Sequence, residues 1–232
     1  MEMKITYHGH SCVQLTTEAG KSLVIDPFLR GNELAVAKPE DIQVDAILLT
    51  HAHMDHILDA EPISKANNAP IVANVELATY LSWKELQTIG MNLGGTVDLG
   101  FAKAKMVQAF HSSGITLADE QRIIYGGMPG GYVVHIDGKT ILHAGDTALF
   151  GDMKLIGDRH DIDVAFIPIG DHFTMGPDDA LQAAEWYGAK LVIPVHYNSF
   201  PVIRQDAQHY VSQLETKGLA GKVLQPGESL DI

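Results

Sequence analysis

The feature that most constrains the fold of this chain is a set of apolar segments that each end in histidine or aspartate. One of them, residues 45–50 (Asp-Ala-Ile-Leu-Leu-Thr), has the composition of a short buried strand and runs directly into the loop 51–56, His-Ala-His-Met-Asp-His. Three further apolar runs are followed in the same way by His111, Asp146 and His196. Because open α/β sheets place ligands at the carboxyl ends of their strands, we expect these residues to meet at one site.

The order of strand-like and helix-like segments predicts the architecture. Strands are expected at 3–8, 12–17, 22–25, 45–50, 71–73, 101–109, 131–137, 139–144, 164–169 and 191–195. Helices are expected at 56–66, at 74–83, from Pro177 onward and at 203–217. The two halves of the chain have a similar rhythm, so we predict one domain over residues 1–232, in which two sheets lie between helical layers.

Charge and composition exclude several classes of protein. The formal net charge of −13 is unfavourable for nucleic acid and for anionic membranes. No apolar run reaches the roughly 18 residues of a membrane span, and the N-terminus has no basic segment followed by an apolar one. The one cysteine, Cys12, rules out an internal disulfide. We therefore expect a cytoplasmic protein with no nucleic-acid or membrane partner, and we leave a homo-oligomer open.

The loop 51–56 has the composition and spacing of a metal site. Alternate residues of an extended segment point the same way, so His51 and His53 can hold one ion, while Asp55 and His56 can face a second. Imidazole and carboxylate suit Zn²⁺, our first choice, and also Mn²⁺ and Fe²⁺. Exposed surface histidines are the alternative, but the apolar strand directly before the loop favours a metal site.

With these motifs the chain resembles the metallo-β-lactamase superfamily, through Thr50-His-Ala-His-Met-Asp-His56 followed in order by His111, Gly145-Asp146 and His196. Other motifs resemble a branch of small metal-dependent hydrolases related to the ascorbate-6-phosphate lactonases, namely Gly9-His10-Ser11, Ile25-Asp26-Pro27, residues 169–177 and Pro194-Val-His-Tyr-Asn198. The resemblance implies an α+β fold, an αββα four-layer sandwich in which two mixed β-sheets pack face to face with helices outside.

The resemblance also implies a dinuclear site with two divalent ions. The implied ligands are His51, His53 and His111 for the first ion, Asp55, His56 and His196 for the second, and Asp146 as the bridge between them. A hydroxide formed from metal-bound water would then attack an ester, lactone or phosphodiester bond of a small soluble substrate.

Residues near the N-terminal strands are weaker candidates for the site. Asp26 ends a strand before a proline, where it is either a turn residue or the acceptor that orients a ligating histidine. His8 and His10 flank Gly9 and share a face by alternation, and the resemblance places His10 at the rim of the metal pocket as a ligand-like or proton-donating group.

Asp171 and His172 follow the strand expected at 164–169, so they reach the same end of the sheet. His172 can bind substrate or protonate a leaving group, and we expect it to be catalytic together with Asp55. A packing role is the alternative for this pair.

Tyr197 and Asn198 follow His196, where they either donate hydrogen bonds to a substrate oxygen or fix the loop. The long connection 112–130 begins at a predicted ligand, so we expect it to overhang the metals, with a disordered surface loop as the alternative. We expect structural roles for the remaining histidines and for the cysteine, namely His135, His143, His160, His209 and Cys12.

The superfamily includes several activities, so the fold alone does not determine the reaction. A di-iron reductase of this fold usually has glutamate where this chain has His53 and carries a flavin domain, and a nuclease normally carries a large inserted domain. The expected function is therefore the hydrolysis described above. A glyoxalase-type thioesterase and a non-catalytic metal-binding or sensor protein are the alternatives left open.

Overall fold

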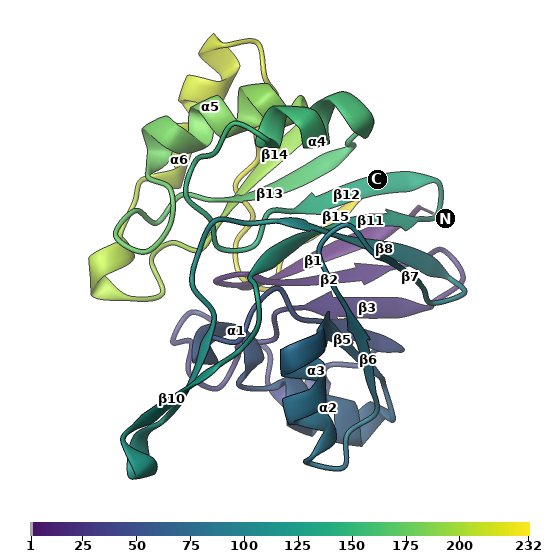
Figure 1. The fold of residues 1–232 in the computed structure, drawn as a ribbon. Helices are drawn as coiled ribbons and strands as arrows, with labels where there is room; N and C mark the ends of the chain where they lie inside the picture. The colour runs from purple at the N-terminus through teal and green to yellow at the C-terminus, as the bar shows by residue number, and fades with distance from the viewer. Residues whose placement is uncertain (1) are drawn as a thin grey trace.

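The computed structural model describes residues 2–232, which form two β-sheets stacked face to face with helices on both outer sides (Figure 1). The expected α+β class and αββα arrangement are thus confirmed. A search of these residues finds no helix with the length and hydropathy needed to cross a membrane.

The first sheet is mixed. Its strands in spatial order are β15 (Ser229–Asp231), β1 (Lys4–Gly9), β2 (Cys12–Thr16), β3 (Ser22–Ile25), β4 (Ala46–Leu48), β5 (Ile71–Asn74) and β6 (Thr88–Met91). Neighbours from β15 to β3 pair antiparallel, and neighbours from β3 to β6 pair parallel.

The second sheet is mixed as well. Its strands in spatial order are β14 (Leu191–Val195), β13 (Val164–Pro168), β12 (Lys139–His143), β11 (Gly130–Ile136), β8 (Ala102–Gln108) and β7 (Thr96–Asp98). The strands β12, β13 and β14 are parallel, and β11 pairs antiparallel with both β12 and β8. Consequently β8, β12 and β14 run in one direction, and their carboxyl ends share one edge of the sheet.

Helices cover the outer face of each sheet, as Figure 1 shows. Beside the first sheet lie α1 (Met54–Ile57), α2 (Ala60–Asn67) and α3 (Val75–Ser82), and beside the second lie α4 (Met153–Arg159), α5 (Pro177–Tyr187) and α6 (Ala207–Thr216). Short 3₁₀ helices occupy Pro39–Asp41, Ala118–Glu120 and Pro201–Ile203.

Three apolar clusters hold the layers together. Between the sheets, Leu15 and Leu48 of the first belong to one cluster with Tyr132 and Phe166 of the second. The two outer clusters join α2 and α3 to the first sheet and α5 and α6 to the second. Because fully burying one large apolar side chain contributes about 1.5–3 kcal/mol, the sandwich has ample driving force without any bound ion.

The segment 112–130, which we expected to overhang the metals, contains regular structure and so differs from the alternative of a disordered surface loop. It contains a two-stranded antiparallel ribbon made of β9 (Gly114–Leu117) and β10 (Arg122–Tyr125), which projects from the body of the protein (Figure 1). Ile115 pairs with Ile124 and is itself buried in the cluster under the first sheet. Ile115, with the partly buried Leu117 and Ile124 that pack against the same cluster, ties the ribbon to the core.

The expected helix 56–66 is interrupted at Asp59. The buried Asp59 carboxylate accepts hydrogen bonds from the backbone N–H groups of Leu29 (2.7 Å) and Arg30 (3.0 Å). These long-range contacts hold Asp59 outside helical geometry, so α1 ends at Ile57 and α2 starts at Ala60. The sequence pattern alone contains no sign of this tertiary constraint.

The expected helix 203–217 begins later, at Ala207, because the Asp206 side chain accepts a hydrogen bond from the His209 N–H and caps the helix there. Ile203 instead closes a 3₁₀ turn. Besides the ribbon strands β9 and β10, the sequence did not predict β6, β7, β15 and α4, because these elements are short or largely exposed and lack a clear period.

Asn74 caps α3 as expected and also anchors the end of the ribbon segment. Its Oδ1 accepts from the Leu77 N–H (2.9 Å), and its Nδ2 donates to the carbonyl oxygens of Gly126 (2.8 Å) and Met128 (3.2 Å). The side chain is therefore fully engaged in a buried position.

We predict that Asn74→Ala lowers the free energy of unfolding by about 1–2 kcal/mol through the lost cap, plus the cost of two buried carbonyls without donors. Chemical denaturation monitored by circular dichroism measures this difference. Asn74→Ser keeps a capping hydroxyl but cannot reach both carbonyls, so it should lose less than Asn74→Ala. Equal stability of Asn74→Ala and wild type would contradict the assignment.

Candidate metal centre

The predicted ligands lie at the carboxyl ends of strands from both sheets. The first sheet contributes the loop after β4, and the second contributes the residues that follow β8, β12 and β14, namely His111, Asp146 and His196. Within this edge, His10, Asp26 and His196 have positive φ angles of 55°, 49° and 54°. Non-glycine residues rarely adopt this conformation, and surrounding contacts must hold them in it.

One group of imidazoles consists of His51, His53 and His111. One ligand atom from each lies within 4.8 Å of the others. Nε2 of His51 is 2.9 Å from Nδ1 of His53, and the ring of His111 lies 5.0–5.1 Å, centroid to centroid, from both. Three imidazoles at this spacing can bind one ion.

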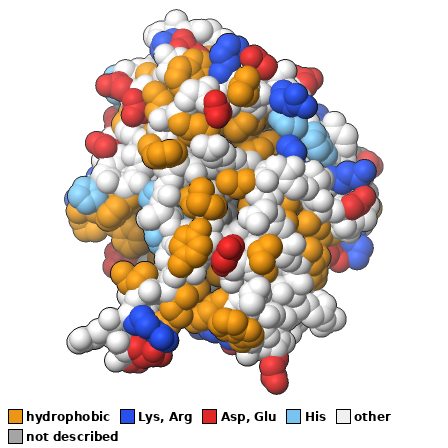
Figure 2. All heavy atoms as spheres, in the orientation of Figure 1, with side chains coloured by type: hydrophobic (Ala, Val, Ile, Leu, Met, Phe, Trp, Pro, Cys, Tyr) orange, Lys and Arg blue, Asp and Glu red, His pale blue; other side chains and the backbone are white. Residues whose placement is uncertain are grey.

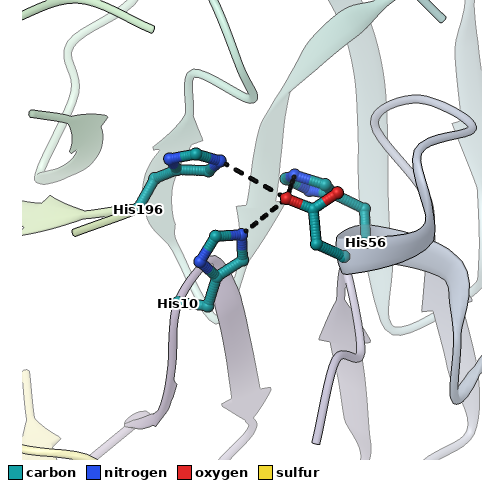
Figure 3. Close-up of side chains that lie close together, drawn as sticks. His10, His56 and His196 are labelled. Carbon is teal, nitrogen blue, oxygen red and sulfur yellow. Dashed lines mark hydrogen bonds and ion pairs between the residues drawn. The ribbon is translucent and has the colours of Figure 1, made fainter. Parts of the chain in front are cut away.

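A second group surrounds the carboxylate of Asp55. Its Oδ2 lies 3.1 Å from Nε2 of His10 and 3.7 Å from Nε2 of both His56 and His196. Figure 3 shows the three rings turned toward one another from separate segments of the chain. His10, His56 and His196 are buried, whereas the Asp55 side chain is 27% exposed.

The carboxylate of Asp146 lies between the two groups. Its Oδ2 is 2.9 Å from Nε2 of His196 and 3.2 Å from Nε2 of His56 on one side. On the other side it is 3.7 Å from Nε2 of His111 and 3.9 Å from Nε2 of His51. A single buried oxygen is thus approached by four imidazole nitrogens.

Asp26 fixes the orientation of His56 from behind. Its Oδ2 is 2.8 Å from Nδ1 of His56. The Thr50 N–H donates to Oδ1 of Asp26 (2.8 Å), and the Thr50 hydroxyl donates to Oδ2 (2.6 Å). A proton on Nδ1 of His56 therefore leaves Nε2 facing the site. Carboxylates commonly orient metal-binding histidines in this way.

The charges at the site favour bound cations. Burial by itself would raise the pKa of Asp146 and Asp55, but His196 and His56 outweigh it and lower the pKa of both carboxyl groups. Burial lowers the pKa of His51, His53 and His111, so these rings are neutral at pH 7. Within residues 2–232, the carboxylates of Asp26, Asp55 and Asp146 form ion pairs with histidine imidazoles and with no lysine or arginine.

The same atoms also lack proper hydrogen-bond partners. Nε2 of His56, Nε2 of His196 and Oδ1 of Asp146 are buried without an acceptable hydrogen bond, although oppositely charged groups lie nearby. Burial opposes a charge on His196, yet the Asp146 carboxylate raises its pKa to about 9. A proton there takes the place of a cation when no ion is bound. The donor set and its unsatisfied atoms therefore fit divalent metal ions.

Comparisons with known proteins agree with this geometry. A family model described as a beta-lactamase superfamily domain matches residues 4–196. A UPF0173 metal-dependent hydrolase of Geobacillus thermodenitrificans is 57% identical over 230 residues, covering 99% of this chain and 100% of the relative. The UPF0173 metal-dependent hydrolase YtkL of Bacillus subtilis is 53% identical with the same coverage.

The chain belongs to the metallo-β-lactamase superfamily. The solved structure of Igni18, described as a novel metallo hydrolase from the archaeon Ignicoccus hospitalis, is 34% identical, with a TM-score of 0.89 over 100% of this chain and 99% of that one. The expected family and the expected enzyme class, a metal-dependent hydrolase, are confirmed by these relatives.

In this member of the metallo-β-lactamase superfamily, four of the weaker candidate site residues lie outside the cluster of histidines and aspartates. Asp171 and His172 have exposed side chains, and the ring of His172 packs against Phe173 at 4.5 Å between centroids. Tyr197 belongs to the apolar cluster over the second sheet, and Oδ1 of Asn198 accepts from the Gln205 N–H (2.9 Å). This placement of Asn198 corresponds to the loop-fixing alternative.

His8 and His10 do not share a face, contrary to the expectation from alternation. The pairing of β1 with β2 shifts register between Tyr7 and Gly9, and Gly9 has a φ of 102°. His8 consequently turns to Gln14, 3.1 Å from its Oε1, while His10 turns into the site. A bulge of this kind re-aims a side chain without changing the sequence pattern.

Several residues that contact the site were not singled out from the sequence, among them Thr50, Ser112 and Ser199. Thr50 bonds to Asp26, and Oγ of Ser199 lies 2.5 Å from Nδ1 of His10. Thr50 directly precedes the histidine loop, so its position was a usable signal. Nothing local to Ser199 indicates its partner, because 189 positions separate the two residues.

We predict that Asp26→Asn weakens metal binding by about 10–100-fold, the usual cost of removing an outer partner of a ligand. The amide tolerates the positive φ of this position but presents no full negative charge to His56. Competition with a chromophoric chelator measures the affinity. Asp178→Asn, on the exposed first turn of α5, serves as the control. An unchanged affinity in Asp26→Asn would remove Asp26 from the metal site.

Proposed function

We propose that this chain hydrolyses an ester, lactone or phosphodiester bond of a small soluble substrate at a dinuclear metal site. The observation that carries the proposal is the position of Asp146, whose Oδ2 lies within 3.9 Å of imidazole nitrogens from both groups. A carboxylate that faces two sets of imidazole nitrogens is suited to bridge two cations.

The proposal assigns the ligands by group. His51, His53 and His111 hold the first ion, Asp55, His56 and His196 hold the second, and Asp146 contacts both. Bound divalent ions supply two things in such a site: a water that is ionised near neutral pH, and a Lewis acid for the oxygen of the bond under attack. We favour Zn²⁺ for this donor set, with Mn²⁺ and Fe²⁺ as the alternatives.

Asp55 has a second, catalytic role in this proposal. It is the most exposed carboxylate of the cluster, at 27%, so it can accept a hydrogen bond from water or substrate at the open side. The lowered pKa of Asp55 keeps this carboxylate ionised and able to accept that hydrogen bond.

We assign His172 to substrate binding or to protonation of the leaving group. The loop that carries His172 is bonded to Thr147, which directly follows Asp146: the Met175 N–H donates to the Thr147 carbonyl oxygen (3.0 Å). Within the loop, the Asp171 N–H donates to the Met175 carbonyl oxygen (3.0 Å). An exposed imidazole on a loop anchored there can bind substrate or protonate a leaving group. Movement of the side chain is required, since its ring now packs on Phe173.

The neighbours of the ligands in the sequence are apolar and exposed, which favours a substrate with an apolar part. Met54 lies inside the histidine loop, Phe110 precedes His111 and Phe173 follows His172, and these three side chains are 44%, 65% and 52% exposed. Figure 2 shows hydrophobic side chains gathered over the centre of the face in view, with most charged ones nearer its edges. Exposed apolar groups of this kind mark binding surfaces.

The proposal also keeps three earlier expectations as predictions. The two sheets share one apolar core, which supports a single domain over the chain. A cytoplasmic location and the oligomeric state stay predictions to be tested separately.

A panel of esters, lactones, phosphodiesters and thioesters, assayed on apo protein with Zn²⁺, Mn²⁺ or Fe²⁺ added back, tests the function. We predict turnover of an ester, lactone or phosphodiester, and a loss of more than about 100-fold in kcat/KM for His53→Ala, since even outer partners of ligands cost 10–100-fold. His209→Ala removes an exposed imidazole from α6 and should leave the activity unchanged.

Three outcomes of this panel argue against the proposal. Preferred turnover of thioesters would favour the glyoxalase-type activity, and two bound ions without any turnover would favour a binding or sensor protein. Protein purified without chelator that contains no stoichiometric metal, together with full activity in His53→Ala, would refute the dinuclear mechanism.

We further predict that removing the ions leaves a folded but less stable protein. The apolar clusters do not involve the ligands, so circular dichroism should keep its native form after chelation. Ligand binding to the native state at 100 times Kd adds about 2.7 kcal/mol, so adding metal back should raise Tm measurably in calorimetry. Identical Tm values with and without metal would contradict binding to the native state.

A further inference from the structure

His10 is the residue whose role the proposed function leaves unassigned. Resting on the dinuclear site proposed above, we infer that Nε2 of His10 is a direct ligand of the second ion, so that each ion is held by three imidazoles. The ligand atoms of His10, Asp55, His56 and His196 all lie within 4.8 Å of one another, which brings four donors around a single point.

Nε2 of His10 faces this point, while Nδ1 of the same ring faces Ser199. Its Nε2 lies 3.1 Å from Oδ2 of Asp55, and its ring centroid lies 4.2 Å from that of His196 and 5.5 Å from that of His56 (Figure 3). The residue is 0% exposed, so it is not a rim group that reaches into solvent.

The backbone of His10 is held in its unusual conformation from two sides. The Tyr7 hydroxyl (3.0 Å) and the His196 N–H (2.8 Å) both donate to the His10 carbonyl oxygen. The second of these bonds fixes the turn after β1 directly to the turn after β14. A non-glycine residue at a φ of 55° costs free energy, and such strain persists where a site requires the side chain to point a certain way.

Nδ1 of His10 has an outer partner, as His56 has. Oγ of Ser199 lies 2.5 Å from Nδ1 of His10, just as Oδ2 of Asp26 lies 2.8 Å from Nδ1 of His56. An outer partner on Nδ1 is the usual arrangement for a histidine that binds metal through Nε2. The hydroxyl accepts the Nδ1 proton in this arrangement, and the Nε2 lone pair then faces the ion.

A positioning role is the competing interpretation. In that case Nε2 carries the proton and donates it to Asp55, while Nδ1 accepts from the Ser199 hydroxyl. The two roles require opposite tautomers of the same ring. The tautomer and the coordination of Nε2 therefore decide between them, independently of any activity.

Nitrogen NMR of protein labelled with ¹⁵N-histidine and loaded with two equivalents of Zn²⁺ reads both properties. We expect the His10 signals, identified by their absence in His10→Asn, to show a protonated Nδ1 and an Nε2 at the position of a coordinated nitrogen. They should move when the second equivalent of Zn²⁺ is added. A protonated Nε2 in the fully loaded protein would overturn the inference.

Metal titration of variants gives a second test. His10→Asn suits the positive φ but is too short to reach the ion, so we expect it to retain one equivalent of Zn²⁺ and to bind the second more than about 100-fold more weakly. Ser199→Ala should weaken only that second equivalent, by about 10–100-fold. His10→Gln replaces His10→Asn if the latter fails to fold by circular dichroism, and His209→Ala is the control.

Failure of this inference is distinguishable from failure of the proposed function. Wild-type protein that binds fewer than two ions would refute the dinuclear site itself. Wild-type protein that binds two ions, alongside His10→Asn that also binds two with unchanged affinity, would refute only the role of His10.

Discussion

The buried carboxylate of Asp146 is the interaction on which the rest of this site depends. A charge removed from water into a protein interior costs several kcal/mol unless partners offset the loss. Here the partners are imidazoles supplied by both sheets, with His56 from one and His196 from the other within 3.2 Å of Oδ2. Divalent cations would offset that cost and would also satisfy the buried nitrogens of His56 and His196 that lack hydrogen bonds. The geometry of the site follows from this requirement.

The sandwich explains how so many polar groups gather without disturbing the core. In strands β4, β8, β12 and β14 the buried residues are apolar except His143, and the candidate ligands come only beyond the carboxyl ends. Sharp turns at His10, Asp26 and His196 then direct the side chains back over the edge of the sheets. The strand residues therefore stabilise the core, while the residues that follow them in the sequence form the site.

Much of this could be predicted from the sequence, because the information is local. His51, His53, His56, His111, Asp146 and His196 each follow an apolar run, and their order matches a known family. What could not be predicted depends on contacts between distant segments. The bulge at Gly9 separates His8 from His10, Asp59 interrupts a helix through bonds to residues 29 and 30, and Ser199 meets His10 across most of the chain. For His172, placement after a strand was right, but the side chain lies exposed against Phe173.

The spread of the ligands along the chain has a consequence for how the protein matures. The donors extend from His10 to His196, and β14 must be in place before the last of them can turn toward Asp146. A nascent chain that has exposed only β1 to β6 presents an incomplete set of these residues, because Asp146 and His196 come later in the chain. A metal ion that needs ligands from both sheets could therefore bind in full only after the two sheets have docked.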